Sequence, residues 1–130
     1  MAWSGNEDYS DSAGRLFIDA ETLYKQNRWE TAGHLYGVAA ECAVKATLKR
    51  GGLAIDKKSG LKTHFPALAG AVSLIAQGRH SMTVFNRAGF LDSWKVDTRY
   101  AKNDGTIEQK LCAAWRQDTA DMLLDCGFIV

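Results

Sequence analysis

The stretch Trp29–Gly52, WETAGHLYGVAAECAVKATLKRGG, decides the fold of this chain. Small residues recur along it at three- and four-residue spacings, which predicts one helix from about Arg28 to Arg50. Small side chains let neighbouring helices approach closely, so we expect this helix to lie at the centre of a helical bundle. Basic residues suit its last turn, and a pair of glycines then stops it. The small residues are Ala32, Gly33, Gly37, Ala39, Ala40, Ala43 and Ala46.

Four further segments show helical periodicity, over residues 11–26, 64–77, 81–94 and 107–125, of which 81–94 is the shorter helix. Residues 53–62 are predicted to form a loop, and residues 95–105 a turn region. Short connections make sequential helices antiparallel, so we expect an all-α fold, an up-and-down bundle of four or five helices. Candidate core residues outside the central helix are Ala13, Leu16, Phe17, Ala20, Leu23, Tyr24, Val84, Phe85, Leu91, Trp94, Ile107, Leu111, Ala114, Trp115, Met122 and Cys126.

The starts of these helices are predicted from residues that satisfy the free N–H groups of a first turn. A serine suits the first helix, and a threonine followed by a proline in the first turn suits the segment 64–77. Two further pairs resemble capping boxes, in which side chains three residues apart bond reciprocally to the backbone. The residues are Ser10, Thr63 with Pro66, Asn27 with Glu30, and Thr106 with Gln109.

Length and composition are those of one globular domain over residues 1–130, with residues 1–10 as a loose N-terminal segment. The chain has 46% hydrophobic and 24% charged residues, which excludes a disordered protein. Its net charge of +1 gives the whole molecule no strong attraction to nucleic acid or to a membrane surface. Any electrostatic partner must therefore be held by a local patch.

The sequence also predicts where the protein resides. The longest apolar run, Phe65–Ala76, is too short to span a bilayer, and the N-terminus lacks the apolar region of a signal peptide. Three cysteines, an odd number without metal-ligand spacing, favour reduced thiols. We therefore expect a cytoplasmic protein that does not enter a membrane.

Polar residues of the central helix and of the turn region are candidates for a site. His34, Glu41 and Lys45 share one helical face. The turn sequence WKVDTRYA, residues 94–101, supplies four more side chains. In one interpretation, two ion pairs among Glu41, Lys45, Asp97 and Arg99 fix the turn against the helix, and Trp94 and Tyr100 pack. In the other, Arg99 and Lys45 hold a phosphate, and Trp94 or Tyr100 stacks a base.

A basic loop follows the central helix. It carries five positive side chains against one acidic residue, Asp56. Such a loop could follow a phosphate backbone, or it could be a solvated loop that keeps the protein in solution. The basic residues are Lys49, Arg50, Lys57, Lys58 and Lys62.

Three short motifs together resemble the HEPN (higher eukaryotes and prokaryotes nucleotide-binding) domains. They are AAECAVKA at residues 39–46, KTHF at 62–65, and WKVDTRY at 94–100, and the similarity extends over about residues 16–122. The resemblance implies a four- or five-helix bundle that forms a homodimer in a prokaryotic defence or toxin–antitoxin system. Many members are metal-independent ribonucleases, others work beside a small nucleotidyltransferase, and some are non-catalytic binding modules.

The family's ribonuclease motif is an arginine followed four to six residues later by a histidine. Here the matching arginine is Arg99, and no histidine follows it in reach, so the chain departs from the motif. One other pair has the spacing, Arg28 with His34, but at the start of the central helix. The catalytic candidates are therefore Arg28, His34 and Arg99. His64 either lines a site or bonds locally, and His80 is predicted to be solvated.

The dispersed histidines predict no metal site, and the absence of a glycine-rich phosphate loop predicts no bound cofactor. The expected function is a small binding module that engages a nucleotide, an RNA or a nucleotidyltransferase partner. A metal-independent ribonuclease and a non-catalytic protein-interaction scaffold are the alternatives. The candidate nucleotide- or RNA-binding residues are Glu41, Lys45, His64, Trp94, Asp97, Arg99 and Tyr100.

Overall fold

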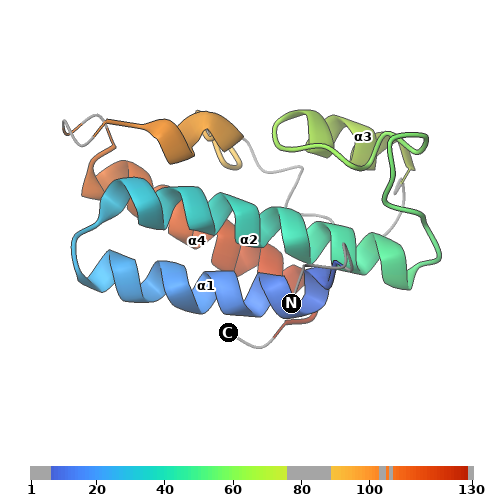
Figure 1. Ribbon diagram of the computed structural model, residues 1–130, viewed down its shortest axis with the longest axis horizontal. Coiled ribbons are helices and arrows are strands. Elements are labelled where there is room, and N and C mark those ends of the chain that lie inside the picture. Colours follow the sequence, from blue (N-terminus) through green and yellow to red (C-terminus); the bar gives the residue numbers. More distant parts are fainter. Residues whose placement is uncertain (1–6, 76–88, 103–104, 106, 129–130) are drawn as a thin grey trace, which may run out of the picture.

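The computed structural model describes residues 7–75, 89–102, 105 and 107–128. Those residues form no strand and four α-helices: α1 (Tyr9–Lys25), α2 (Trp29–Arg50), α3 (Ala67–Ile75) and α4 (Gln109–Asp125). A short 3₁₀-helix, η2 (Val96–Tyr100), precedes α4. The helices pack against one another as a bundle (Figure 1), which confirms the predicted all-α fold.

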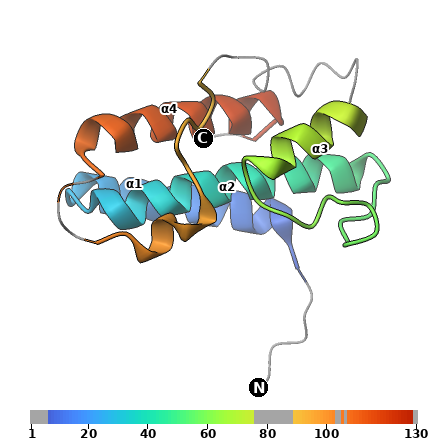
Figure 2. The same cartoon turned by 90° about the horizontal axis from the view of Figure 1, so that it is seen from above.

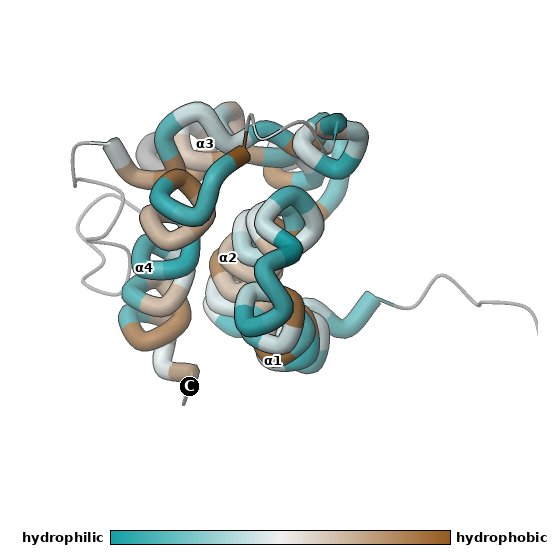
Figure 3. Tube along the Cα trace, turned by 90° about the vertical axis from the view of Figure 1, so that its left-hand side faces the viewer, coloured by the Kyte–Doolittle hydropathy of each residue, from teal (hydrophilic) through white to brown (hydrophobic). Residues whose placement is uncertain are grey.

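The three long helices lie side by side with α2 between α1 and α4, as the view in Figure 3 shows. A tight turn makes α1 and α2 antiparallel, and the Tyr24 ring lies 5.0 Å from the Trp29 ring across that turn. Helix α4 runs in the same direction as α2. The Thr119 hydroxyl donates to the Tyr36 carbonyl, in the first half of α2, at 2.9 Å. The C-terminal ends of the two helices also lie next to each other. The three long helices therefore form a bundle in which α1 and α2 are antiparallel and α2 and α4 are parallel.

Helix α2 is the central helix, as its small residues predict. Most of its second half is buried, and its glycines serve as contact points for tryptophans. A Cβ at Gly33 would lie 2.7 Å from the ring of Trp115, and a Cβ at Gly37 would overlap the ring of Trp94. The absence of side chains at these two positions therefore lets large aromatic rings pack directly on the helix backbone.

Helix α3 and helix η2 lie on the same side of α2 (Figures 1 and 2). Helix α3 lies over the C-terminal half of α2, and η2 lies over its N-terminal half. The Trp94 indole N–H fixes the second arrangement, because it donates to the Gly33 carbonyl at 2.9 Å. The segment just before α3 and the turn just before η2 therefore meet the same face of α2.

The helix starts differ from the predicted caps. Helix α1 begins after Asp8, whose side chain accepts the Asp11 N–H, so Ser10 lies inside the helix and residues 9–10 are not loose. Asn27 has a φ of 61°, and α2 begins after Arg28 without a side-chain cap, so the predicted Asn27–Glu30 box is absent. Helix α3 starts three residues later than predicted, directly after Pro66.

Helix α4 starts after Glu108, so Gln109 is its first residue and closes no capping box. Thr106 lies outside the described residues, as does Gln77 at the predicted end of the third helix. The prediction that Ala114 faces the core is wrong, since this residue is exposed. The buried face of α4 instead consists of Cys112, Trp115, Thr119, Met122 and Leu123.

The predicted helix 81–94 is absent over its described residues, 89–94. Residues 81–88, which include the candidates Val84 and Phe85, lie outside the described residues. Residues 89–93 form turns, with positive φ at Gly89, Leu91 and Ser93. Leu91 and Trp94 are nevertheless buried, as predicted. A search of the described residues for a helix with the length and apolarity that a bilayer crossing requires finds none.

Candidate functional site

Basic and aromatic side chains gather on the face of α2 that meets η2 and the segment before α3. We name this group the histidine cluster: His34, Glu41, His64, Trp94 and Arg99. His34 and Glu41 are two turns apart on one helical face, as predicted. His64 comes from the segment before α3, and Arg99 comes from η2. Three separate parts of the chain therefore supply its basic groups.

Glu41 connects the cluster to the segment before α3. Its carboxylate is buried, and the Phe65 backbone N–H donates to Oε2 at 2.7 Å. Nδ1 of His64 lies 3.0 Å from Oε1. Burial raises the pKa of Glu41, and the hydrogen bonds from His64 and Phe65 oppose this rise. Glu41 thus fixes the His64 ring by one nitrogen, and 54% of the His64 side chain stays exposed to solvent.

His34 is held against Trp94. The two rings are nearly parallel, at an interplanar angle of 11° and a centroid distance of 6.2 Å. Nδ1 of His34 is buried and finds no hydrogen-bond partner among the described residues. Burial lowers the pKa of His34, and the positive charges of Arg99 and His64 lower it further. His34 is therefore neutral at neutral pH and lies within electrostatic reach of two basic groups.

Arg99 and Tyr100 form the exposed edge of the cluster. The Arg99 guanidinium lies 4.8 Å from the centroid of the Tyr100 ring. Tyr100 is 72% exposed, an unusual position for a large aromatic side chain. No carboxylate in the described part of the chain pairs with Arg99. This pair therefore offers a guanidinium and a ring face to an incoming ligand.

The predicted association of Glu41 and Lys45 with Asp97 and Arg99 does not form. Asp97 is exposed on η2, and Glu41 bonds to the segment before α3 instead. Lys45 turns toward α1, where its Nζ lies 5.7 Å from the centroid of the Tyr9 ring. The antiparallel packing of α1 places that ring beside the second half of α2. The predicted phosphate pocket of Arg99 with Lys45 is therefore not assembled.

Arg28 and His34 are not brought together either. Arg28 is exposed at the start of α2 and lines a shallow pocket with Asn27, Glu30, Thr31 and Ala101. His34 lies almost two turns further along, and the charges that act on it are those of Arg99 and His64. Arg99 is thus the predicted arginine whose charge acts on His34.

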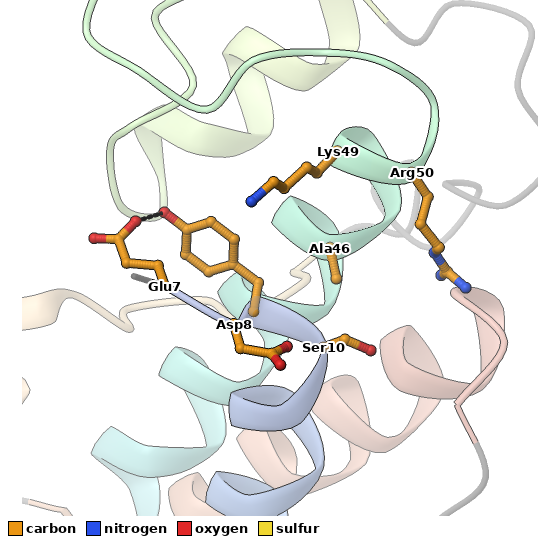
Figure 4. A pocket seen from close by; sticks show the side chains of 7 residues that line it. Glu7, Asp8, Ser10, Ala46, Lys49 and Arg50 are labelled. Carbon is orange, nitrogen blue, oxygen red and sulfur yellow. Dashed lines mark hydrogen bonds between the residues drawn. The ribbon is translucent and has the colours of Figure 1, made fainter. Parts of the chain in front are cut away.

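The five residues of the basic loop have different surroundings. Arg50 donates to the Cys126 carbonyl at 3.0 Å and lies over the Phe128 ring. Lys62 forms an ion pair of 3.9 Å with Glu7. Lys49 lines a pocket between the start of α1 and the end of α2 (Figure 4). Lys57 and Lys58 are exposed. The loop is therefore not one free basic surface, because two of its residues stabilise the fold.

The three cysteines are buried and free, so they supply no reactive thiol. Burial raises the pKa of Cys42 to about 11 and that of Cys112 to about 12, which keeps both thiols protonated. The described residues contain no group of three or more histidine, cysteine or acidic side chains placed to hold a metal ion. The chemistry that the cluster offers is anion binding, proton transfer by imidazole, and stacking.

Sequence reasoning missed the pairing of Glu41 with His64 and the contact of Tyr9 with Lys45. The first has no local signal, because the two residues are separated by a loop. The second has one, since Tyr9 lies four residues before Ala13 and extends the apolar stripe of α1.

Comparison of the chain with known proteins identifies no relative. No protein-family model, no curated protein and no solved structure matches the chain. The resemblance to HEPN domains therefore stays an expectation that rests on short motifs.

Proposed function

We propose that this chain is a small helical binding module that recognises a phosphate-bearing ligand, a nucleotide or single-stranded RNA, at the histidine cluster. One observation carries the proposal. His34, His64 and Arg99 come from three parts of the chain, and the charges of Arg99 and His64 both disfavour a proton on His34. Basic groups whose charges act on one another in this way favour an anion among them.

The local charge balance supports a phosphate. Glu41 is the carboxylate that contacts the cluster, and both its oxygens are engaged by His64 and by the Phe65 N–H. Arg99 has no carboxylate partner within the described residues. Phosphate oxygens accept strong, charge-assisted hydrogen bonds from guanidinium and imidazolium groups. A bound phosphate would therefore replace mutual repulsion among these groups with attraction.

The exposed Tyr100 ring supports a base beside that phosphate. Bases stack on aromatic rings and on guanidinium planes when they are free of a duplex. Tyr100 and Arg99 present both surfaces, with the guanidinium 4.8 Å from the ring centroid and 72% of Tyr100 exposed. We therefore expect preference for single-stranded RNA or a free nucleotide over duplex RNA.

Fluorescence anisotropy with labelled single-stranded RNA, competed by nucleoside monophosphates, tests the proposal. We expect Arg99→Gln and His64→Gln each to weaken binding about tenfold, because each removes a hydrogen bond to a charged group. Lys25→Gln, an exposed residue in the last turn of α1, removes the same charge elsewhere and serves as the control. If the wild-type protein binds neither probe at millimolar concentration, the proposal fails.

A second candidate function is metal-independent ribonuclease activity. The observation that favours it is the presence of two imidazoles and a guanidinium in one cluster, with Glu41 fixing the His64 ring. Two histidines can serve as general base and general acid, and an arginine can stabilise charge on the phosphorus oxygens. RNA cleavage in EDTA that disappears in His34→Gln and in His64→Gln would support it. A wild-type protein inert on structured and unstructured RNA would exclude it.

We further propose that the module acts as a homodimer in the cytoplasm, in a defence or toxin–antitoxin system with a nucleotidyltransferase as protein partner. The motif resemblance supports this setting, and the three unpaired cysteines suit a reducing compartment. Analytical ultracentrifugation tests the dimer, and a monomer at high micromolar concentration would contradict it. Co-purification with the product of an adjacent gene tests the partner.

A further inference from the structure

A carboxylate of the chain itself, that of Glu7, lies in a pocket lined also by Tyr9, Lys49 and Arg50, at the opposite end of α2 from Arg99. The pocket has a volume of about 470 Å³ and lies between the start of α1 and the end of α2. Figure 4 shows Glu7 on one side of it and the Lys49 ammonium pointing toward that side. The Tyr9 hydroxyl donates to Oε2 of Glu7 at 2.5 Å.

Three ammonium groups act on this one carboxylate. Nζ of Lys62 lies 3.9 Å from Oε1 of Glu7. The hydrogen bond from Tyr9 lowers the pKa of Glu7 most, and the charges of Lys62, Lys45 and Lys49 lower it further. Within the described residues, Lys45 and Lys49 form no ion pair with another carboxylate. The Glu7 carboxylate is therefore subject to three positive charges.

The fold prepares this arrangement before any ligand arrives. Lys45 and Lys49 are four residues apart and share a face of α2. The stem of Lys45 is buried, with only 7% of the residue exposed, and its ammonium lies over the Tyr9 ring. Lys62 arrives from the loop that follows α2. An ordered lysine stem and a fixed hydroxyl donor distinguish this place from an ordinary solvated basic surface.

We propose that Lys45, Lys49, Lys62 and Tyr9 form a second phosphate-binding site, which Glu7 occupies in the absence of ligand. A phosphate carries more negative charge than a carboxylate and more acceptor oxygens. It therefore competes with Glu7 for the same donors. The pocket volume leaves room for the phosphate and for part of the group that carries it.

Asp8 also lines this pocket but does not occupy the lysine site. Its side chain accepts the Asp11 N–H and caps α1. Arg50, on the far side of the pocket, donates to the Cys126 carbonyl. The donors left for a ligand are those that Glu7 now uses. This inference is independent of the histidine cluster, since the two sites share no residue.

Isothermal titration calorimetry with inorganic phosphate and with adenosine monophosphate, at constant ionic strength, tests the proposal. All proteins carry Arg99→Gln, which removes the ligand contact of the histidine cluster. We expect Glu7→Gln to tighten phosphate binding about threefold, because the variant removes the carboxylate that competes with phosphate. That factor corresponds to the contribution of one surface ion pair. Lys49→Gln with Lys62→Gln, added to Glu7→Gln, should weaken binding about tenfold or more.

Matched variants serve as controls. Glu108→Gln removes a carboxylate that caps no N–H group at the start of α4, and Lys25→Gln with Lys110→Gln removes two exposed lysines from other helices. Equal affinity in Glu7→Gln and Glu108→Gln would overturn the proposal. Equal affinity in the two double-lysine variants would overturn it as well. Tighter binding of adenosine monophosphate than of phosphate would identify a nucleotide as the source, and the reverse order a free phosphate.

Discussion

The indole of Trp94 lies against the backbone of Gly37, so closely that a Cβ at residue 37 would overlap the ring. The same indole donates to the Gly33 carbonyl at 2.9 Å and stacks on His34. A glycine inside a helix weakens it, and here that loss makes space for the ring that positions the histidine cluster. The small residues of α2 therefore connect the fold to the site.

Gly37→Ala is expected to destabilise the protein by about 3 kcal/mol, because the added methyl group must displace a buried indole. The Trp94 ring has 2% exposure and no free space to enter, so the turn before η2 must move with it. Urea unfolding followed by circular dichroism measures the loss. The same variant should bind RNA more weakly, since His34 loses its stacking partner.

Gly14→Ala is the matched control for this change. Gly14 lies within α1, and a Cβ there would meet nothing within 4 Å. We expect the substitution to stabilise the protein by about 0.5–1 kcal/mol, through helix propensity alone. If both alanine variants shift stability equally, Trp94 does not pack on Gly37 as described.

Glu41→Ala is expected to lower the free energy of unfolding by about 2 kcal/mol, because it leaves the buried Phe65 N–H without an acceptor. Glu41→Gln keeps an acceptor at that position and should change stability by less than about 1 kcal/mol. The two variants thus separate the hydrogen bond from the charge. Equal losses in both would show that the carboxylate charge matters more than the acceptor.

The pH dependence of Glu41→Gln gives a second readout. Burial raises the pKa of Glu41 above its ordinary value of 4.5. A carboxyl group with a raised folded-state pKa contributes stability below pH 4.5, and this contribution is lost as pH rises through the folded-state pKa. Relative to wild type, Glu41→Gln should therefore gain stability from pH 4.5 upward. Thermal melting across that range, with both proteins in the same buffers, measures the difference.

Arg116→Lys is expected to destabilise the protein by about 1 kcal/mol, because a lysine cannot reproduce a two-pronged contact between α4 and α1. Nε and Nη2 of Arg116 lie 2.6 and 3.0 Å from the two carboxylate oxygens of Glu21. The Tyr36 hydroxyl donates to the same carboxylate. Since Arg116 is partly exposed, the loss should shrink in molar salt.

Arg15→Lys provides the comparison for Arg116→Lys. Arg15 approaches Asp11 at 3.7 Å, and both side chains are largely exposed. A single long contact of this kind contributes little, so we expect a change within about 0.5 kcal/mol. A salt-independent loss in Arg116→Lys, or an equal loss in Arg15→Lys, would contradict the bridging role of Arg116.

The central helix could be predicted from the sequence because its small residues and its glycine stop are local signals. The turns before η2 could not, because helical periodicity continues through residues 89–93. The burial of Leu91 and Trp94 overrides that periodicity and places Leu91 and Ser93 at positive φ. The local pattern therefore identified Leu91 and Trp94 as buried but did not predict the backbone of residues 89–93.

The sequence predicted which residues of α2 belong to the candidate site better than it predicted which side chains they contact. His34 and Glu41 share a face because both belong to one helix, which spacing alone establishes. Their partners depend on how the loop crosses α2 and where α1 begins. The path of the loop brings His64 to Glu41, and the position of the start of α1 brings the Tyr9 ring to Lys45. Such choices are tertiary, so the ion pairs with η2 that the sequence predicted did not form.

The stability of the protein should decrease as pH falls from neutral, and His34 should account for part of the decrease. Burial and the charges of Arg99 and His64 lower its pKa from 6.5. A histidine with a lowered folded-state pKa contributes stability above pH 6.5, which is lost as pH falls toward the folded-state value. His34→Gln should therefore melt with a flatter dependence on pH below 6.5.

A bound phosphate should reverse this behaviour. An anion beside His34 raises the pKa of this histidine, so the complex binds a proton at a pH at which His34 of the free protein is neutral. Binding should then tighten as pH falls below neutral in the wild-type protein, and less so in His34→Gln. RNA titrations at pH 5.5 and 7.5 with both proteins measure this coupling. Parallel pH profiles for the two proteins would place the ligand away from His34, because a phosphate in contact with that ring has to shift its protonation.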